Sequence, residues 1–270
     1  MDDTVFSSEA SMQTLLAVMA RALVCDDSRT WAVLPEHQVH GRIPDLVIGR
    51  IDERALQTRL GSSEWRRGLS EIELRALRGL RSDRGRSVTS LASEIRVGER
   101  RARDVLRVLV RQGFADRSSS GSFVRVAPIM PILDRIVSFE AKRSDLGRAY
   151  VQARAHTMFA DRSFVVFDIA YLARALAARD AYRSGGIGMI GLGADASWQI
   201  LERSRRSVLR AAIGRALAAE RALTRLLGAP VRSLPEARLP HGSPASEYPA
   251  EPELVGPRAN ALRPLLACHA

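Results

Sequence analysis

The sequence contains a single lysine, Lys142, and its other 40 basic residues are all arginines. An ammonium group is compact and strongly hydrated, whereas the guanidinium group of arginine is a planar fork that is always charged. A lone lysine therefore indicates a position where the arginine fork is a poor substitute, such as beside a metal ion or a phosphate. Lys142 ends the strand-like run 136–141 and follows Glu140 by two residues.

Two apolar strands must position these groups if they act together. Because side chains of a strand alternate between its faces, Glu140 and Lys142 point to the same side of residues 135–141. A second run, 45–51, begins with Asp45 directly after Pro44, and it is apolar enough to be buried on both faces. The sequence therefore predicts two buried strands that carry acidic groups at their ends.

The remaining periodicity predicts an α/β domain interrupted by another segment. We expect a helix over 9–24 and a strand over 30–34 before the second strand. After residue 130 the pattern resumes, and helices and strands alternate. The predicted elements of this second part are helix 145–159, strand 163–167, helix 169–181, strand 187–192 and helix 198–227.

The interrupting segment, residues 66–127, is strongly basic. It holds 15 arginines against seven acidic residues, which accounts for +8 of the chain's net charge of +11. Its pattern predicts helices over 70–81, 88–95 and 99–111, then a hairpin that pairs 114–117 with 122–126. Three helices followed by a two-stranded wing is the plan of a winged helix-turn-helix.

Helix 99–111 would be the recognition helix of this plan. The residues available for DNA phosphates or base edges are Arg100, Arg101, Arg103 and Arg107 on that helix and Arg117 and Arg125 on the wing. The segment resembles winged-helix regulators of the MarR and GntR classes through the runs Leu-Ala-Ser-Glu-Ile (91–95) and Arg-Val-Leu-Val-Arg-Gln-Gly-Phe (107–114). The alternative is a winged helix used for protein contacts, with its arginines forming a solvated face.

The interrupted domain resembles the PD-(D/E)XK nuclease superfamily. The resemblance rests on Pro44-Asp45 and on Glu140-Ala141-Lys142, followed by a helix with Gln152, the strand 164–168 and the glycine-rich strand 188–193. It covers roughly residues 9–61 and 130–200. The resemblance implies a restriction-endonuclease-like fold, in which helices cover both faces of a mixed sheet.

The resemblance also implies site residues and a cofactor. Asp45 and Glu140 would bind Mg²⁺ or Mn²⁺, which prefer carboxylate oxygens, and the Ala141 carbonyl is a further candidate ligand. Lys142 would orient the attacking water or offset charge on the scissile phosphate. The implied supporting residues are Gln152 as a positioning group and Glu9, or else Glu36 from the strand before Asp45, as an added ligand.

Each of these residues also has a purely structural interpretation. Glu140 and Lys142 could form an ion pair at a strand end, and Asp45 could cap a turn after Pro44. Glu9 and Glu36 could be ordinary surface acids. The separation of Asp45 and Glu140 is longer than in many members of the superfamily, and only the inserted segment accounts for it.

These patterns predict four parts of the chain: 1–65 and 128–227 as the two pieces of the core, 66–127 as the insert, and 228–270 as a Pro-rich, mostly disordered tail.

The two cysteines, Cys25 and Cys268, form no metal-ligand cluster. The acidic start and the lack of a long apolar run predict a cytoplasmic protein without a membrane partner. The histidines show no metal spacing. His156, one helical turn after Gln152, is expected on the helix surface, and the alternative is that it faces the site. The string Gly186–Gly191 matches a dinucleotide fingerprint but runs into a strand rather than a helix, which argues against that function.

We therefore expect a DNA-binding protein, acting on duplex DNA, with a metal-dependent nuclease core targeted by the winged helix. The alternative is a non-enzymatic DNA-binding regulator that uses an inactive nuclease-like core for dimerisation or DNA clamping. A third hypothesis is a protein-interaction scaffold. The sequence leaves a homodimer open.

Overall fold

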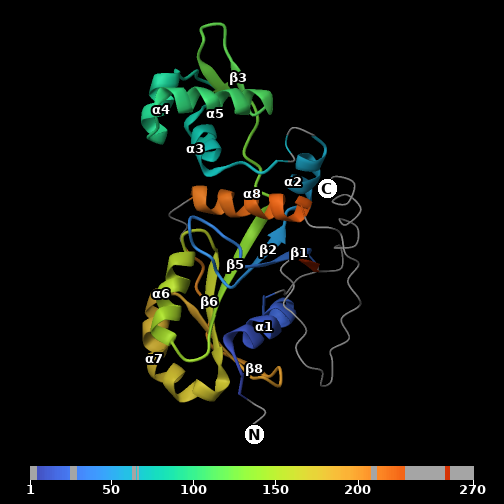
Figure 1. The fold of residues 1–270 in the computed structure, drawn as a ribbon, viewed down its shortest axis with the longest axis vertical. Helices are drawn as coiled ribbons and strands as arrows, with labels where there is room; N and C mark the ends of the chain where they lie inside the picture. Colours follow the sequence, from blue (N-terminus) through green and yellow to red (C-terminus); the bar gives the residue numbers. More distant parts are fainter. Residues whose placement is uncertain are drawn as a thin grey trace.

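The computed structural model describes residues 5–24, 29–62, 65, 67–207, 212–228 and 253–255. These residues form a mixed α/β fold around one seven-stranded sheet with the order β8-β7-β6-β5-β2-β1-β9 (Figure 1). Its strands are β1 (Trp31–Pro35), β2 (Leu46–Ile51), β5 (Leu133–Lys142), β6 (Arg162–Asp168), β7 (Gly188–Leu192), β8 (Trp198–Glu202) and β9 (Glu253–Val255).

Strand direction changes at the centre of this sheet, beside the predicted site. Strands β5, β6 and β7 are parallel, so their carboxyl ends meet at one edge. Strand β2 runs antiparallel to β5, with Leu46 opposite Phe139, so that the start of β2 lies at the same edge. Asp45, immediately before β2, is thereby brought close to Glu140 and Lys142 at the end of β5.

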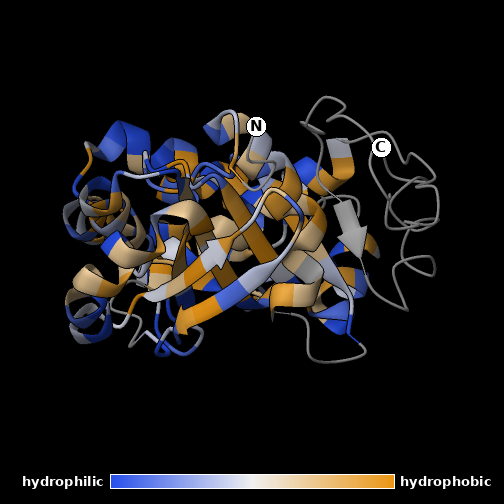
Figure 2. Cartoon of the chain, turned by 90° about the horizontal axis from the view of Figure 1, so that it is seen from below, coloured by the Kyte–Doolittle hydropathy of each residue, from blue (hydrophilic) through white to orange (hydrophobic). Residues whose placement is uncertain are grey.

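Helices cover both faces of the sheet because most of its strand positions are apolar. Helix α1 (Glu9–Val24) packs on the face that carries Val137, Phe139 and Ala141. Helices α6 (Leu146–His156) and α7 (Leu172–Gly185) pack on the opposite face against Val165 and Phe167. Figure 2 shows the hydrophobic strands between helices whose outer surfaces are hydrophilic.

The inserted lobe stands at one end of the molecule, above α8 in Figure 1. Its elements are α3 (Glu71–Gly79), α4 (Val88–Ile95), α5 (Glu99–Arg111), β3 (Ala115–Arg117) and β4 (Phe123–Arg125). The side chain of Ser87 caps α4 by accepting the Ser90 N–H at 3.2 Å, and Ser70 with Glu73 forms a capping box at α3. The lobe therefore consists of three helices followed by a two-stranded antiparallel hairpin.

A buried ion pair joins this lobe to the rest of the molecule. Arg59 of α2 (Glu53–Leu60) donates to both carboxylate oxygens of Glu220 in α8 (Ala212–Gly228), at 2.6 and 2.8 Å. Glu220 also accepts the Leu69 backbone N–H at 2.8 Å. The backbone before Leu69 passes so close to α8 that a Cβ on Gly68 would lie 2.5 Å from the Glu220 carbonyl oxygen. A continuous hydrophobic core then runs from α8 into α3 and α5.

The structure corrects several expectations about these elements. The helix expected over 198–227 is wrong, because 198–202 form β8 and the helix begins only at Ala212. Residues 198–202 pair instead with the exposed edge of β7, through a turn in which Asp195 accepts the Ser197 N–H at 3.0 Å. Helix α2 was not anticipated, although Asp52 caps it.

The expected tail is corrected at three residues. Residues 253–255 form β9, which pairs with β1 at the edge of the sheet. The rest of the segment for which disorder was expected, after Gly228, lies outside the described residues. The helices predicted over 9–24, 88–95 and 99–111 agree with α1, α4 and α5.

Candidate active site

Asp45 is held at the start of β2 by the backbone of β5. The Ala141 N–H donates to Asp45 Oδ2 at 2.7 Å, which joins two residues that are 96 positions apart in sequence. This hydrogen bond fixes the orientation of the carboxylate beside the end of β5. Asp45 therefore does more than cap a turn after Pro44, because its side chain connects two neighbouring strands.

Lys142 is the centre of the cluster. Its Nζ lies 3.2 Å from Glu140 Oε1 and 3.7 Å from Asp45 Oδ2, and it donates to the Ala141 carbonyl at 3.0 Å. The side chain of Lys142 is 12% exposed, and that of Glu140 is 1% exposed. The structure thus brings together the two carboxylates and the lysine in a largely buried position, where charges interact more strongly than on the surface.

Glu9 joins the same cluster from the first turn of α1. Its Oε2 lies 3.4 Å from Lys142 Nζ, and its side chain is 44% exposed, so it forms the outer rim of the cluster. Of the two additional acids predicted from the sequence, Glu9 is the one whose carboxylate contacts Lys142 in the structure.

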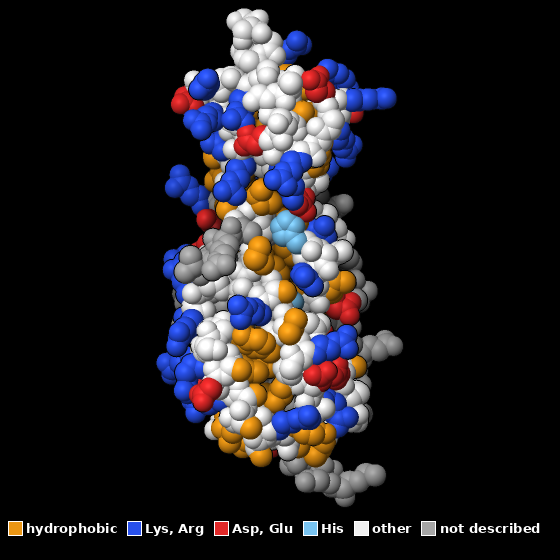
Figure 3. All heavy atoms as spheres, turned by 90° about the vertical axis from the view of Figure 1, so that its left-hand side faces the viewer, with side chains coloured by type: hydrophobic (Ala, Val, Ile, Leu, Met, Phe, Trp, Pro, Cys, Tyr) orange, Lys and Arg blue, Asp and Glu red, His pale blue; other side chains and the backbone are white. Residues whose placement is uncertain are grey.

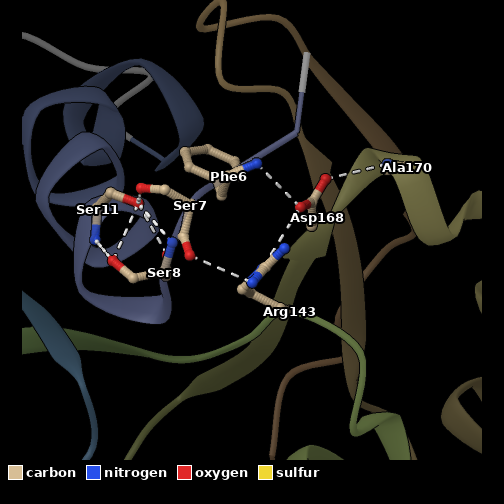
Figure 4. Close-up of polar contacts among 7 residues, drawn as sticks. All are labelled: Phe6, Ser7, Ser8, Ser11, Arg143, Asp168 and Ala170. Atoms are coloured by element: carbon tan, nitrogen blue, oxygen red, sulfur yellow. Dashed lines mark hydrogen bonds and ion pairs between the residues drawn. The ribbon is translucent and has the colours of Figure 1, made fainter. Parts of the chain in front are cut away.

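A buried aspartate fixes the segment that leads into α1. Asp168 at the end of β6 accepts the Phe6 N–H at 3.1 Å, and its Oδ2 lies 3.8 Å from Arg143 Nε (Figure 4). Arg143 also donates to the Ser7 carbonyl at 3.3 Å. Because Arg143 follows Lys142 directly, this network couples the position of α1, and so of Glu9, to the end of β5. The sequence pattern assigned no such role to Asp168 or Arg143.

Glu36 lies at the edge of the site rather than within it. The expectation that it comes from the strand before Asp45 is wrong, because β1 ends at Pro35 and Glu36 adopts a left-handed conformation with a φ of 46°. Its backbone N–H donates to the Asp45 carbonyl at 3.1 Å, but its side chain is exposed. Its charge nevertheless contributes to raising the pKa of Asp45.

Helix α6 closes the buried side of the cluster. Gln152 Oε1 and Glu140 Oε2 are both buried and have no hydrogen-bond partner within the described part of the chain. His156 Nε2 lies 3.9 Å from Glu140 Oε2. The expectation of a surface histidine is therefore wrong, since His156 is 2% exposed and faces Glu140. Its position one helical turn after Gln152 was the signal that could have identified it.

Burial disfavours the charged form of the two acids at the centre of the site, Asp45 and Glu140. Burial raises the pKa of the Glu140 carboxyl to about 7, and the charge of Asp45 adds to this shift. Burial likewise raises the pKa of Asp45. Burial alone would lower the pKa of Lys142, but Asp45, Glu140 and Glu9 together outweigh it and raise that pKa. Lys142 consequently stays a cation beside two carboxylates, Asp45 and Glu140, whose pKa values burial raises.

The donor set fits a small hard cation that keeps much of its water. Among the described residues no group of three or more His, Cys, Asp or Glu side chains is arranged to hold a metal. Mg²⁺, however, is commonly bound through one or two carboxylates, with water and phosphate completing its octahedron. Asp45 and Glu140 supply that number, and the unpartnered Glu140 Oε2 is a buried acceptor of the required kind.

The basic residues predicted to contact DNA lie apart from this cluster, on the inserted lobe. Helix α5 buries Ala102, Val105, Leu106 and Leu109 and leaves Arg100, Arg101, Arg103 and Arg107 exposed. On the wing, Arg117 is exposed, whereas Arg125 is half-buried and its backbone N–H donates to the Arg81 carbonyl at 2.9 Å.

Comparisons with family models, with curated proteins and with solved structures found no match to this chain. Among the described helices, none is both long and apolar enough to cross a membrane. The fold and the geometry of the site therefore carry the functional interpretation by themselves.

Proposed function

We propose that this chain is a DNA-binding protein whose restriction-endonuclease-like core hydrolyses phosphodiester bonds with Mg²⁺ or Mn²⁺. The observation that carries the proposal is the position of Lys142 Nζ, 3.2 Å from Glu140 and 3.7 Å from Asp45 at one edge of a mixed sheet. Asp45 precedes Glu140 and Lys142 by almost one hundred positions, yet the three side chains meet there. They are the only lysine of the sequence and two largely buried acids.

Each side chain has a role in this chemistry. Asp45 and Glu140 would hold the cation, and the Ala141 N–H keeps the Asp45 carboxylate aimed at it. When bound, such a cation supplies polarisation of the phosphoryl oxygen and a lower pKa for the attacking water. Lys142 would donate a hydrogen bond to that water or to a phosphate oxygen, and its charge would offset the negative charge that develops.

Helix α6 would act as a support for the reacting groups. Gln152 Oε1, which is buried without a hydrogen-bond partner in the described part of the chain, would accept a hydrogen bond from a bound water. His156 lies against the second oxygen of Glu140. Burial lowers the pKa of His156 to about 4, and the charge of Arg42 adds to this effect, so the imidazole is neutral at pH 7. A neutral imidazole limits the orientation of Glu140 without competing with a cation for its charge.

A cleavage assay on duplex, single-stranded and branched DNA, with Mg²⁺ or Mn²⁺, tests the proposal. We expect Lys142→Ala and Asp45→Asn each to lower the cleavage rate by at least about 100-fold. Asp180→Asn, which changes an exposed acid on α7, is the matched control and should cut at the wild-type rate. Wild-type protein that cuts no substrate, or a Lys142→Ala protein that cuts as fast as wild type, would contradict the enzymatic proposal.

The alternative is a DNA-binding regulator with an inactive core. The ammonium that already lies between the two carboxylates favours it. In that case wild-type protein binds duplex DNA, cuts nothing with either cation, and binds equally well after Asp45→Asn.

A further inference from the structure

An arginine-lined cavity lies between the winged-helix lobe and the sheet domain, away from Lys142. Its volume is about 1020 Å³, and its walls come from α3, the end of α6, the α7–β7 turn, the loop after β8 and the turn at 39–42. No aspartate or glutamate is among its described lining residues. The arginines that line it are Arg42, Arg75, Arg78, Arg154, Arg205 and Arg206.

Most of these arginines have no counter-charge. Arg75 pairs with Glu71 at 2.5 Å, and Arg154 donates to the Tyr150 hydroxyl at 3.0 Å. For the other four, no side-chain hydrogen bond or ion pair exists within the described part of the chain. Some arginines outside the cavity do have an acidic partner, as Arg179 and Arg183 have in Glu202, both at 3.1 Å.

A second cavity makes the contrast clear. It is smaller, about 380 Å³, and its two arginines, Arg29 and Arg54, share it with Asp52, Glu53 and Asp134. There the acids of the protein balance the basic groups. Of the arginines that line the large cavity, Arg75 alone has an acidic partner within the described part of the chain, and repulsion between the others disfavours the folded state unless an anion binds. Arginine forks match phosphate oxygens with two parallel hydrogen bonds.

We propose that the large cavity binds the sugar-phosphate backbone of one nucleic-acid strand, as a site separate from the recognition helix α5. The arginines come from four segments around the walls, which suits successive phosphates along a strand better than a single small anion. Figure 3 faces the side of α6 and α7 and shows basic side chains on the upper lobe and at its junction with the lower lobe.

The position of the cavity connects the two parts of the molecule. Helix α6 presents Arg154 to the cavity, while its His156 faces Glu140 of the carboxylate–lysine cluster. On the other wall, Arg78 belongs to α3 of the winged-helix lobe. The cavity therefore lies between the basic lobe and helix α6, which also contacts the carboxylate–lysine cluster through His156. This inference deepens the proposed function and rests on it.

The test is the salt dependence of duplex binding by the full-length protein in EDTA, where metal-dependent cleavage is prevented. Each phosphate contact contributes a slope of about −0.9 to the plot of log affinity against log salt. We expect Arg205→Ala/Arg206→Ala to weaken binding by about 10- to 100-fold at low salt and to make the slope less steep by about 1 to 2, equally for unrelated duplex sequences. Arg205→Lys/Arg206→Lys should recover most of the slope.

Arg29→Ala/Arg54→Ala is the matched control, because it removes the same charge from the acid-balanced cavity. It should bind with nearly the wild-type slope. If both alanine pairs shift the slope equally, or if Arg205→Ala/Arg206→Ala leaves it unchanged while wild type binds DNA, the cavity proposal is wrong and the proposed function survives. If wild-type protein binds no DNA at all, both fail.

A folding defect is recognised from the thermal melting of each variant. Arg78→Ala, on the opposite wall of the cavity, then provides the same test from a different element and should reduce the slope by about 1. If the slope falls as expected but wild type cuts no DNA with Mg²⁺ or Mn²⁺, the cavity proposal stands and only the nuclease part of the proposed function is lost.

Discussion

The inserted lobe and the sheet domain arrange their charged side chains in opposite ways. On α5, Arg103 pairs with Glu99 at 2.7 Å and Arg107 with Asp104 at 2.9 Å, so the partners are three or four residues apart and exposed. In the sheet domain, Lys142 contacts Glu9, which is 133 residues away, and its main partner Glu140 is almost fully buried.

This difference teaches which interactions each region depends on. An exposed pair one helical turn apart contributes little and can be lost without consequence, because water replaces each partner. A buried charge that loses its partner has no such replacement, so removing the partner destabilises the whole domain. The exposed face of α5 is thus free to rearrange around a ligand, whereas the cluster around Lys142 is held in one geometry.

The buried pair at the junction of the two regions gives the largest expected effect. Glu220→Ala would leave Arg59 buried without a carboxylate and remove the acceptor of the Leu69 N–H. We expect the free energy of unfolding to fall by about 3 to 5 kcal/mol. Urea unfolding followed by circular dichroism and by tryptophan fluorescence measures it, and Trp65 lies within the junction.

The matched control for this prediction is Arg59→Met/Glu220→Leu, which removes both charges and keeps apolar volume. It should cost less than Glu220→Ala, because no unpaired charge remains. If the single variant is as stable as wild type, the junction does not depend on the pair. Buried and exposed charge pairs would then not differ in their contribution to stability, contrary to the comparison above.

The pH dependence of stability gives a smaller effect, specific to the sheet domain. Burial raises the pKa of Glu140 from 4.5 to about 7, so between these values the native state binds a proton that the unfolded state releases. Stability from this group therefore falls as pH rises from about 4.5 to 7, by about 3 kcal/mol in total. Glu140→Gln lacks the titrating group and should not show this fall.

The measurement is the difference in unfolding free energy between wild type and Glu140→Gln at several pH values. The buried His37, whose Nε2 contacts the Ala218 carbonyl rather than Glu140, titrates alike in both proteins, so its contribution cancels. A difference that stays constant from pH 4.5 to 8 would show that Glu140 is not held in a buried, charge-disfavouring position.

The smallest expected effect on stability belongs to an exposed ion pair of the inserted lobe. A double-mutant cycle of Glu99→Ala and Arg103→Ala should give a coupling free energy of about 0.3 to 0.5 kcal/mol, and high salt should reduce it. Thermal unfolding at two salt concentrations measures it. A coupling above about 2 kcal/mol would contradict the contrast, since the pair would then behave as a buried one.

Much of the fold could be predicted because its signals are local. Ser87 caps α4, and the spacing of Leu91 and Ile95 defines the buried face of that helix. These signals act within a few residues, so the predicted bounds of α1, α4 and α5 agree with the structure. The prediction was wrong at Trp198–Glu202, where pairing with the edge of β7 outweighs local preference.

The candidate site was predictable in its residue types and less so in its surroundings. The single lysine, two residues after Glu140, indicated the cluster. Asp168 was missed because a lone aspartate has no distinctive local pattern, whereas His156 was expected on the surface although its spacing from Gln152 allowed the position that it occupies. Their roles follow only from the packing of α6 against β5 and of the segment at Phe6 against the end of β6.

The sequence by itself determined the three-helix basic lobe, the apolar strands, and the identity of the one lysine and the acids near it. These depend on caps, on the periodicity of two or 3.6 residues, and on residue chemistry, all of which act over short stretches of chain. Only the tertiary structure decided that Asp45, Glu9 and His156 surround Glu140 and Lys142, and that unpaired arginines from both lobes face one cavity. Such meetings depend on the pairing of strands and the docking of helices, and they join residues as far as 133 positions apart in the chain.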